Sequence, residues 1–251
     1  MIPVKQQRGK KSPCLQKSIY FNVKVVLDYD PFGPRWPSGR TIGVFHRFSD
    51  ACGKSYNQLK NNYIMRDDII KTRWHGRGGQ GAITAAKIVA EAAFRTGYSG
   101  VVMAPTFGTE RRGAPVFTSL KFAATKIYDL SPITEPDMVI VLDHLLLEEV
   151  DVAAGLRPGG LIVINSPKAP EAYSFPGMRV ATADVTNIAL TGGLPPGIVN
   201  TGIIGAFGKA AGLMSIDSLC EAIEAEFAGK NGRKNADVAR TTYEHTRVGD
   251  A

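Results

Sequence analysis

Two short glycine-containing segments hold the residues of this 251-residue chain that are best suited to binding chemistry. We call the first the glycine loop; it spans residues 76–81 and reads Gly76-Arg77-Gly78-Gly79-Gln80-Gly81. It follows a strand-like segment and precedes a helix-like one, the context in which the spacing G-x-G-x-x-G predicts a ligand loop. Its glycines permit a tight turn, and the N–H groups at the start of the next helix attract phosphate or carboxylate. The alternative is purely structural, a tight turn with close helix–sheet packing.

The glycine loop does not complete the fingerprint of a dinucleotide-binding enzyme. That fingerprint requires an acidic residue at the end of the second strand, where it holds the ribose. This chain has Met103-Ala104-Pro105-Thr106 there. An enzyme that uses NAD through this loop is therefore disfavoured. His75 adjoins the loop, and we interpret it as a strand-end residue with a satisfied ring in preference to a catalytic one.

We call the second segment the arginine loop, residues 105–115. Its polar and glycine residues include Glu110, Arg111, Arg112 and Gly113. The loop follows the second predicted strand, so in an open parallel sheet it would border the crevice at the strand ends. Arginine suits bidentate binding of phosphate or carboxylate. Salt bridges that hold the loop or a subunit contact would use the same residues, and the sequence does not decide between these alternatives.

Other catalytic signatures are missing from the sequence. Gly53-Lys54-Ser55 resembles the end of a phosphate-binding P-loop, but Phe48 stands where that motif needs its first glycine. The four histidines have no metal-ligand spacing, and no G-x-S-x-G motif is present. The three cysteines include no CxxC pair, which argues against a zinc site, a disulfide scaffold or an iron–sulfur cluster. We therefore assign no catalytic residue and no metal ligand to the chain.

Strand and helix signals alternate after Met65. Strands are predicted at residues 69–74, 101–104, 116–122, 138–142, 161–164 and 178–181, and helices at residues 82–96, 145–150, 202–211, 216–228 and 235–246. The apolar run at residues 138–142 is typical of a central parallel strand. This order predicts an α/β fold with an open, mostly parallel, Rossmann-like sheet, helices on both faces and a helical C-terminal part.

The first 64 residues differ from the rest of the chain in charge. They carry 11 Lys and Arg against 3 Asp and Glu, a net charge of +8, whereas residues 65–251 have a net charge of −1. Three interpretations of this N-terminal extension remain open: a disordered basic arm, a small extra lobe, or sequence upstream of a start at Met65. We favour the last, because the pattern of a compact domain begins directly after Met65.

The charge distribution and the apolar pattern also limit the binding partners that the sequence predicts. The globular part is nearly neutral, so it lacks the positive charge on which nucleic-acid binding depends. No stretch approaches the roughly 20 apolar residues of a membrane span. We therefore expect a cytoplasmic protein that binds neither nucleic acid nor membranes.

The two loops together are similar to those of the gamma subunit or domain of the 2-oxoacid:ferredoxin oxidoreductases, of which pyruvate synthase is the best-known member. Further matches are Glu135-Pro136-Asp137, Asp143, Gly155-Leu156, Gly159-Gly160, Asn165, Asn200 and Gly205. The resemblance covers about residues 68–244, so residues 65–251 are interpreted as one gamma-type domain. Residues 1–64 have no counterpart in that pattern.

The resemblance implies a role inside a larger enzyme. Such complexes decarboxylate a 2-oxoacid oxidatively on thiamine diphosphate, transfer the acyl group to coenzyme A and pass electrons through iron–sulfur clusters to ferredoxin. It implies partners of alpha, beta and delta type that carry the thiamine diphosphate, Mg and clusters, while this chain holds no cofactor firmly and contacts coenzyme A. We hypothesise that the glycine loop or the pair Arg111 and Arg112 receives a coenzyme A phosphate.

Two alternatives to a pyruvate synthase-like subunit remain open at this stage. One is a subunit of an oxidoreductase for indolepyruvate, branched-chain or aryl 2-oxoacids. The other is a stand-alone nucleotide-binding regulatory module with the basic arm as a tether. The sequence does not name the oxoacid, because the pocket for its side chain is expected on partner chains.

Overall fold

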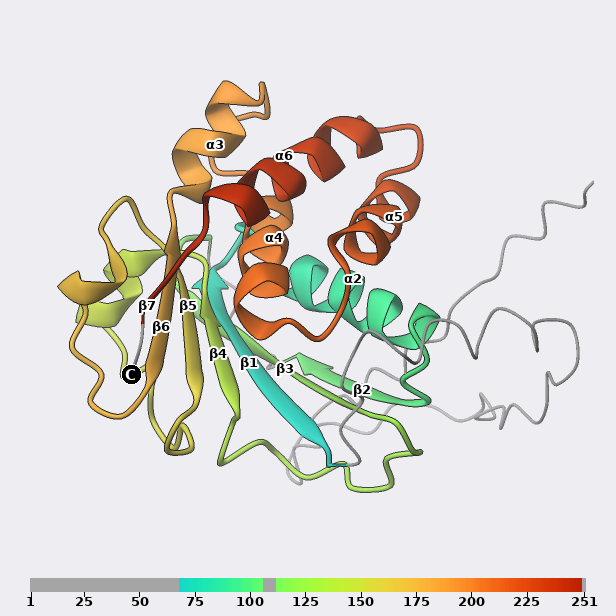
Figure 1. The fold of residues 1–251 in the computed structure, drawn as a ribbon, viewed down its shortest axis with the longest axis vertical. Helices are drawn as coiled ribbons and strands as arrows, with labels where there is room; N and C mark the ends of the chain where they lie inside the picture. The colour runs from blue at the N-terminus through green and yellow to red at the C-terminus, as the bar shows by residue number, and fades with distance from the viewer. Residues whose placement is uncertain (1–67, 106–111, 250–251) are drawn as a thin grey trace, which may run out of the picture.

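A seven-stranded sheet with the order β2-β3-β1-β4-β5-β6-β7 runs through the computed structural model, which describes residues 68–105 and 112–249 (Figure 1). The strands are β1 (Ile70–Arg77), β2 (Gly100–Pro105), β3 (Pro115–Ala123), β4 (Met138–Val141), β5 (Leu161–Asn165), β6 (Arg179–Ala183) and β7 (Arg247–Gly249). β1, β4, β5 and β6 are mutually parallel, while β3 is antiparallel to both β1 and β2. β2 therefore points the same way as β1, and the predicted mostly parallel α/β sheet is confirmed.

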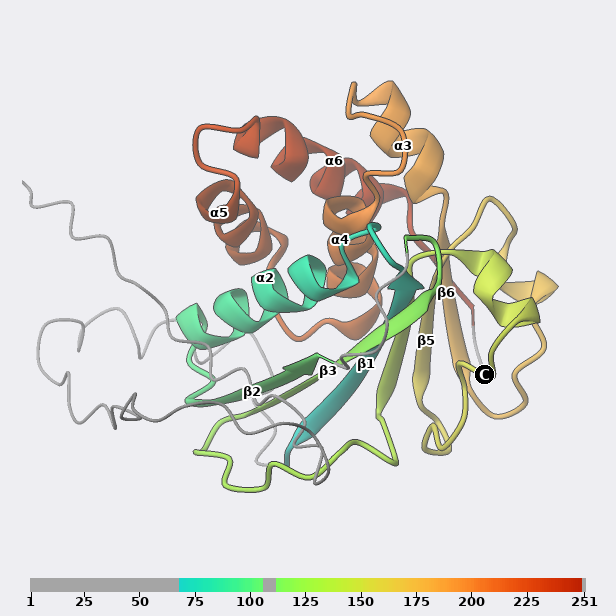
Figure 2. The same cartoon turned by 180° about the vertical axis from the view of Figure 1, so that it is seen from behind.

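The α-helices of the described chain gather on one side of this sheet, as Figures 1 and 2 show. They are α2 (Ala82–Arg95), α3 (Val185–Thr191), α4 (Asn200–Ala211), α5 (Ile216–Glu226) and α6 (Gly232–His245), with two 3₁₀ helices, η1 (His144–Glu148) and η2 (Pro170–Ala172). The opposite face of β4 and β5 is covered by Leu146 of η1 and by the turns that follow it. Helical cover on this second face thus consists of a 3₁₀ helix in place of an α-helix.

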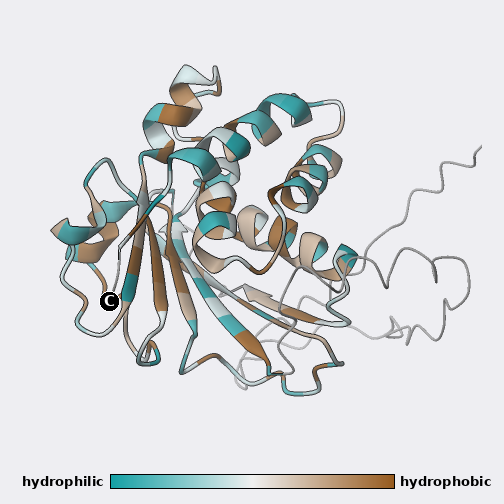
Figure 3. Cartoon of the chain, viewed as in Figure 1, coloured by the Kyte–Doolittle hydropathy of each residue, from teal (hydrophilic) through white to brown (hydrophobic). Residues whose placement is uncertain are grey.

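The central strands are apolar on both faces because both faces are covered. Ile140 of β4 packs in the large core beneath the α-helices, whereas Val139 and Val141 pack in the smaller core beneath η1. Successive side chains of a strand point to opposite faces, so a strand buried on both sides must be apolar throughout. Figure 3 shows the resulting hydrophobic colouring of the central strands.

The C-terminal helices form a small bundle in which α4 passes close to α6. A Cβ atom on Gly205 would lie 1.9 Å from the carbonyl oxygen of Ala239. Only glycine permits this approach of the two backbones, which explains the residue at this position. None of the helices in the described ranges is long and apolar enough to cross a membrane.

The predicted elements match the observed ones closely in the long segments. The helix expected at residues 82–96 is α2, and the three C-terminal helices expected are α4, α5 and α6. Three short elements, α3, η2 and β7, were not predicted; α3 has seven residues and the other two have three each, lengths at which periodicity carries little information. The extension assigned to residues 1–64 lies outside the described residues, and the interpretations of it stay predictions.

Candidate functional site

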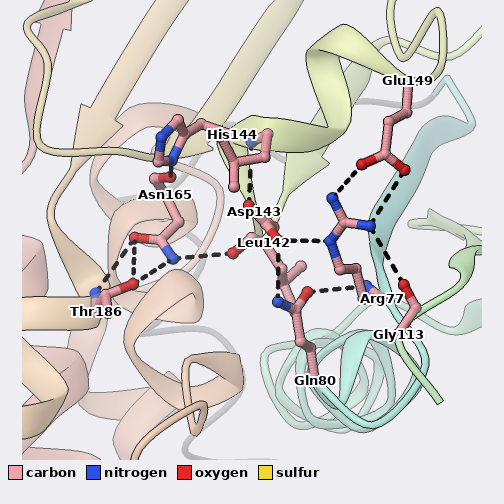
Figure 4. Close-up of polar contacts among 10 residues, drawn as sticks. Arg77, Gln80, Gly113, Leu142, Asp143, His144, Glu149, Asn165 and Thr186 are labelled. Carbon is pink, nitrogen blue, oxygen red and sulfur yellow. Dashed lines mark hydrogen bonds and ion pairs between the residues drawn. The ribbon is translucent and has the colours of Figure 1, made fainter.

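The order of the strands reverses between β1 and β4. From β1 the chain moves through β2 and β3 to one side of the sheet, and from β4 it moves through β5 and β6 to the other. Ligands of open α/β sheets bind at such a reversal point, outside the carboxyl ends of the strands. The glycine loop begins with the last two residues of β1, and Asp143 follows β4, so both lie at this reversal point (Figure 4).

The backbone conformation of the glycine loop accounts for several of its glycines. Gly79 and Gly81 have φ values of 95° and 79°, in the left-handed region that favours glycine. Gly81 caps α2, and a Cβ atom there would lie 2.9 Å from Nδ2 of Asn200. A Cβ atom on Gly76 would lie 3.1 Å from the Cβ of Ala82. Backbone conformation and close packing together favour glycine at position 81, whereas at position 76 a Cβ atom would make a tight contact.

Gly79 differs from the other two, because the space beside it faces the arginine loop. A Cβ atom on Gly79 would have only the Cγ of Arg112 within 4 Å among the described residues, at 3.9 Å. The N–H of Gly78 donates to the carbonyl of Ala114 at 2.9 Å, and the N–H of Gly113 donates to the carbonyl of Gly78 at 3.0 Å. The fold thus brings the two loops side by side.

The remaining predicted residues of the two loops lie in different surroundings. Gln80 joins the polar network described next, and Arg112 and Gly113 lie exposed next to the glycine loop. Glu110 and Arg111 lie outside the described residues. The binding role assigned to the nine predicted residues stays a prediction.

A network of charges holds the carboxyl end of β1 to the carboxyl end of β4 (Figure 4). Nε of Arg77 lies 2.8 Å from Oδ2 of Asp143, and its Nη1 donates to Oε2 of Glu149 at 3.2 Å. Gln80 completes the network: its Nε2 donates to Oδ2 of Asp143 at 3.3 Å, and its Oε1 accepts from the N–H of Arg77 at 2.8 Å. The sequence offered a signal for Asp143, as a strand-end residue, but none for Glu149.

The protonation states of this network follow from its contacts. Burial acts to raise the pKa of Asp143, but hydrogen bonds from Arg77, the N–H of Leu145 and Gln80 outweigh it and lower the pKa. The hydrogen bond from Arg77 likewise lowers the pKa of Glu149. Hydrogen bonds to both carboxylates raise the pKa of Arg77. One guanidinium thus faces two carboxylates at neutral pH, and Arg77 is not available to bind an anionic ligand.

Arg112 is in the opposite situation. Its side chain is exposed, and it has no ion-pair partner among the described residues. Among the described residues of the two loops, Arg112 is therefore a cation that can meet an anion beside the open backbone of Gly79.

His75 lies on β1 immediately before the glycine loop. Its ring is buried and stacks on Phe117 of β3, with 5.6 Å between the ring centroids. Its Nε2 has no hydrogen-bond partner, so the expected satisfied ring is not found within the described structure. Burial, aided by the nearby charge of Arg73, lowers the pKa of His75 to about 4, and the ring is neutral at neutral pH.

Comparison with known proteins agrees with the architecture. The family described as pyruvate ferredoxin/flavodoxin oxidoreductase matches residues 71–245 of this chain. The chain belongs to this family. It is 48% identical over 185 residues to the pyruvate/ketoisovalerate oxidoreductases common subunit gamma of Pyrococcus furiosus, a match that covers 72% of this chain and 98% of that protein. It is also 47% identical over 180 residues to the pyruvate synthase subunit PorC of Methanothermobacter thermautotrophicus, covering 70% of this chain and 95% of that protein.

A solved structure is similar as well. The pyruvate oxidoreductase subunit PORC from Thermotoga maritima superposes with a TM-score of 0.62 at 29% sequence identity, covering 72% of this chain and 99% of that one. These findings confirm the resemblance to the gamma component of the 2-oxoacid:ferredoxin oxidoreductases and the prediction of an oxidoreductase subunit. The family match begins at residue 71, after the basic extension.

Several residues that carried the resemblance prove to have structural roles in this member of the family. Asn165 at the end of β5 is buried; its Nδ2 donates to the carbonyl of Leu142 at 2.9 Å and to Oγ1 of Thr186 at 3.0 Å. It thereby ties the ends of β4 and β5 to the start of α3 (Figure 4). At the amino ends of β1 and β4, Oδ2 of Asp137 accepts from the N–H of Lys71 at 2.8 Å.

The described residues contain no group of three or more His, Cys, Asp or Glu side chains that could hold a metal ion. Cys220 is buried in the core, and burial raises the pKa of its thiol, so it is poorly suited to ligate metal. The other two cysteines, Cys14 and Cys52, lie outside the described residues.

Proposed function

We propose that the chain is the gamma subunit of a complex that oxidatively decarboxylates a 2-oxoacid to an acyl-coenzyme A and CO₂ and reduces ferredoxin. The observation that carries this proposal is the match over 98% of the subunit gamma of Pyrococcus furiosus at 48% identity. A stand-alone regulatory module is disfavoured, because the similar proteins are named as subunits of oxidoreductases.

The oxoacid is proposed to be pyruvate, with branched-chain oxoacids as a second class. The name of the Pyrococcus furiosus protein states that one gamma subunit is common to pyruvate and ketoisovalerate oxidoreductases. A subunit shared between two oxoacids does not by itself select between them. We infer that the side-chain pocket for the oxoacid lies on partner subunits.

The cofactors are proposed to lie on partner subunits of alpha, beta and delta type. Bound there, thiamine diphosphate would stabilise the carbanion left by decarboxylation, and iron–sulfur clusters would carry electrons to ferredoxin. This distribution is supported by the similar proteins, which are named as single subunits of oxidoreductases.

The part proposed for this chain is to receive an anionic group of coenzyme A at the reversal point of the sheet. The side chain of Arg112 passes beside Gly79, with its Cγ 3.9 Å from where a Cβ atom on Gly79 would lie, and the missing side chain of Gly79 leaves the backbone open to a ligand. The start of α2 adds a positive helix end without a side-chain cap. Arg77 would act differently: through Asp143 and Glu149 it holds the loop in place, without touching the ligand.

The double variant Arg111→Ala with Arg112→Ala tests this part of the proposal. Charge-assisted hydrogen bonds contribute about 1.5–3 kcal/mol each, so loss of one should raise the KM for coenzyme A by roughly 10-fold or more. We expect kcat at saturating coenzyme A and co-purification of partners to change little. Arg240→Ala is the matched control, because it also removes a surface arginine, one that pairs only with the exposed Asp217. An unchanged KM, or loss of assembly, would contradict the binding role; loss of assembly would make the arginines interface residues.

The complex itself is tested by affinity purification of the chain from its native host. Dye reduction that depends on both a 2-oxoacid and coenzyme A, with co-purified thiamine- and cluster-bearing subunits, is the expected result. A panel of pyruvate, branched-chain, aryl and indolepyruvate substrates then identifies the acid. A lone, inactive chain would refute the proposal and favour the binding module.

A further inference from the structure

A second pocket lies at the carboxyl ends of β5 and β6, separated from the glycine loop by β4. Its volume is about 240 Å³, smaller than the pockets that hold whole drug-sized ligands. Its polar lining residues are Ser166, Lys168, Thr182, Asp184, Asn187, His245 and Arg247. Carboxyl ends of parallel strands are where open α/β sheets bind ligands, and nothing in the site described above uses this pocket.

The sheet register places the central residues of the pocket on one face. Thr182 of β6 pairs with Ile164 of β5 on one side and with Arg247 of β7 on the other. Ser166 follows Ile164 by two residues, and its N–H donates to the carbonyl of Ala183 at 2.9 Å. Residues paired across neighbouring strands lie side by side on the same face. The hydroxyls of Ser166 and Thr182 therefore form a floor, with Arg247 beside them.

The floor of the pocket offers a hydrogen-bond donor. Ser166 is 2% exposed, and its oxygen accepts from the hydroxyl of Tyr173 at 2.6 Å and from the N–H of Lys168 at 3.0 Å. The Ser166 hydroxyl is thus already hydrogen-bonded, since either hydroxyl of the Ser166–Tyr173 pair can donate to the other. Thr182, 1% exposed, has no side-chain hydrogen bond to a described residue, and its hydroxyl is therefore the free donor of the floor.

The rim of the pocket is positive. Lys168 and Arg247 are exposed and have no ion-pair partner in the described part of the chain. Asp184 is the one acidic side chain of the lining, and its Oδ1 is engaged by the N–H of Asn187 at 3.0 Å. His245 donates through Nδ1 to the carbonyl of Thr241 at 2.8 Å. Two cations and the hydroxyl of Thr182 thus outweigh one carboxylate, and the formal charge of these side chains is positive.

We propose that this pocket is a binding site for a phosphate-type oxyanion. The Thr182 hydroxyl lines the pocket without a partner among the described residues, so it can donate to a ligand there. An oxyanion accepts from this hydroxyl and also neutralises the two cations at the rim, which an uncharged acceptor does not. The small volume limits the occupant to a phosphate group, free or at the end of a larger ligand that extends into solvent.

The test is titration of the full-length chain with inorganic phosphate, followed by calorimetry and by phosphorus NMR. Lys168→Ala, Arg247→Ala and the isosteric Thr182→Val should each weaken phosphate binding, the charge variants by about 10-fold or more. Lys126→Ala is the matched control, because Lys126 lies over Tyr128, outside the pocket, and should leave the affinity unchanged. Thermal unfolding of each variant shows whether the fold is kept.

Two results would overturn the proposal. One is the absence of saturable phosphate binding in the millimolar range. The other is binding that the folded pocket variants leave unchanged, which would place the anion elsewhere on the chain. Competition of bound inorganic phosphate with coenzyme A and with dephospho-coenzyme A identifies the natural ligand of the pocket. Displacement of phosphate only by coenzyme A supports a ligand with a phosphomonoester group. Displacement by neither compound supports free phosphate as the ligand.

Discussion

The buried ring of His75 makes the stability of the chain depend on pH in a range where few other groups titrate. The pKa of His75 lies near 4 in the folded protein because of burial, against 6.5 for an ordinary histidine. The unfolded chain therefore binds a proton at a pH where the folded chain does not. The contribution of the neutral His75 ring to the free energy of unfolding is therefore fully present above pH 6.5 and is lost as the pH falls toward 4.

The size of the effect follows from the difference between these pKa values. At about 1.36 kcal/mol per pH unit, the full loss below the folded pKa is roughly 3 kcal/mol, and the loss between neutral pH and about pH 5 is roughly 2 kcal/mol. The variant His75→Leu should abolish this dependence. At neutral pH we expect it to change stability little, because the ring has an unpartnered Nε2 and stacks on Phe117 in apolar surroundings.

The assay is urea unfolding of wild type and variant at several pH values between about 8 and 5. The wild type should lose roughly 2 kcal/mol over this range, and His75→Leu should lose much less. His245→Leu is the control, because that residue is exposed. An equal slope in wild type and His75→Leu, or a His75 resonance that titrates near 6.5, would refute the reasoning.

Two further substitutions test the packing and the charge network. Gly205→Ala should destabilise the chain by roughly 1–3 kcal/mol in denaturant unfolding, since its Cβ would meet the backbone of Ala239. Gly208→Ala should cost less, because its Cβ would clash with the flexible tip of Leu219 and would touch the ring of Tyr243 at ordinary contact distance. Asp143→Asn removes a charged partner of Arg77 and should cost roughly 1.5–3 kcal/mol at neutral pH. Because the folded pKa of Asp143 is lowered, its contribution is lost as the pH falls below about 4, so wild type and Asp143→Asn should converge there; divergence would contradict the assignment.

The sequence by itself determined the class of fold and the place of the first loop. Apolar runs such as residues 138–142 identify strands buried on both faces, and the glycine loop shows where a strand turns into α2. These are local signals: the period of the side chains and the conformational freedom of glycine act within a few residues. The family resemblance rested on the same local patterns and is confirmed.

Only the tertiary structure decided which groups of the site remain available. Arg77 and Arg112 are both loop arginines in the sequence, yet Arg77 is neutralised by Asp143 and Glu149, which lie 66 and 72 residues further along the chain. Gly81 reads as a ligand-binding glycine, but packing against Asn200 demands it. The order of the strands sets these pairings, and β3, inserted antiparallel between β2 and β1, was not evident from periodicity.

The pocket proposed to bind phosphate also depends on the order of the strands. Ser166, Thr182 and Arg247 are far apart in the chain and carry no shared motif, and they meet because β5, β6 and β7 are neighbours. Periodicity reports which face of its own element a side chain occupies, whereas the partner across the sheet depends on the topology of the whole domain. Long-range pairing of this kind is the physical reason why chemistry at strand ends had to be read from the structure.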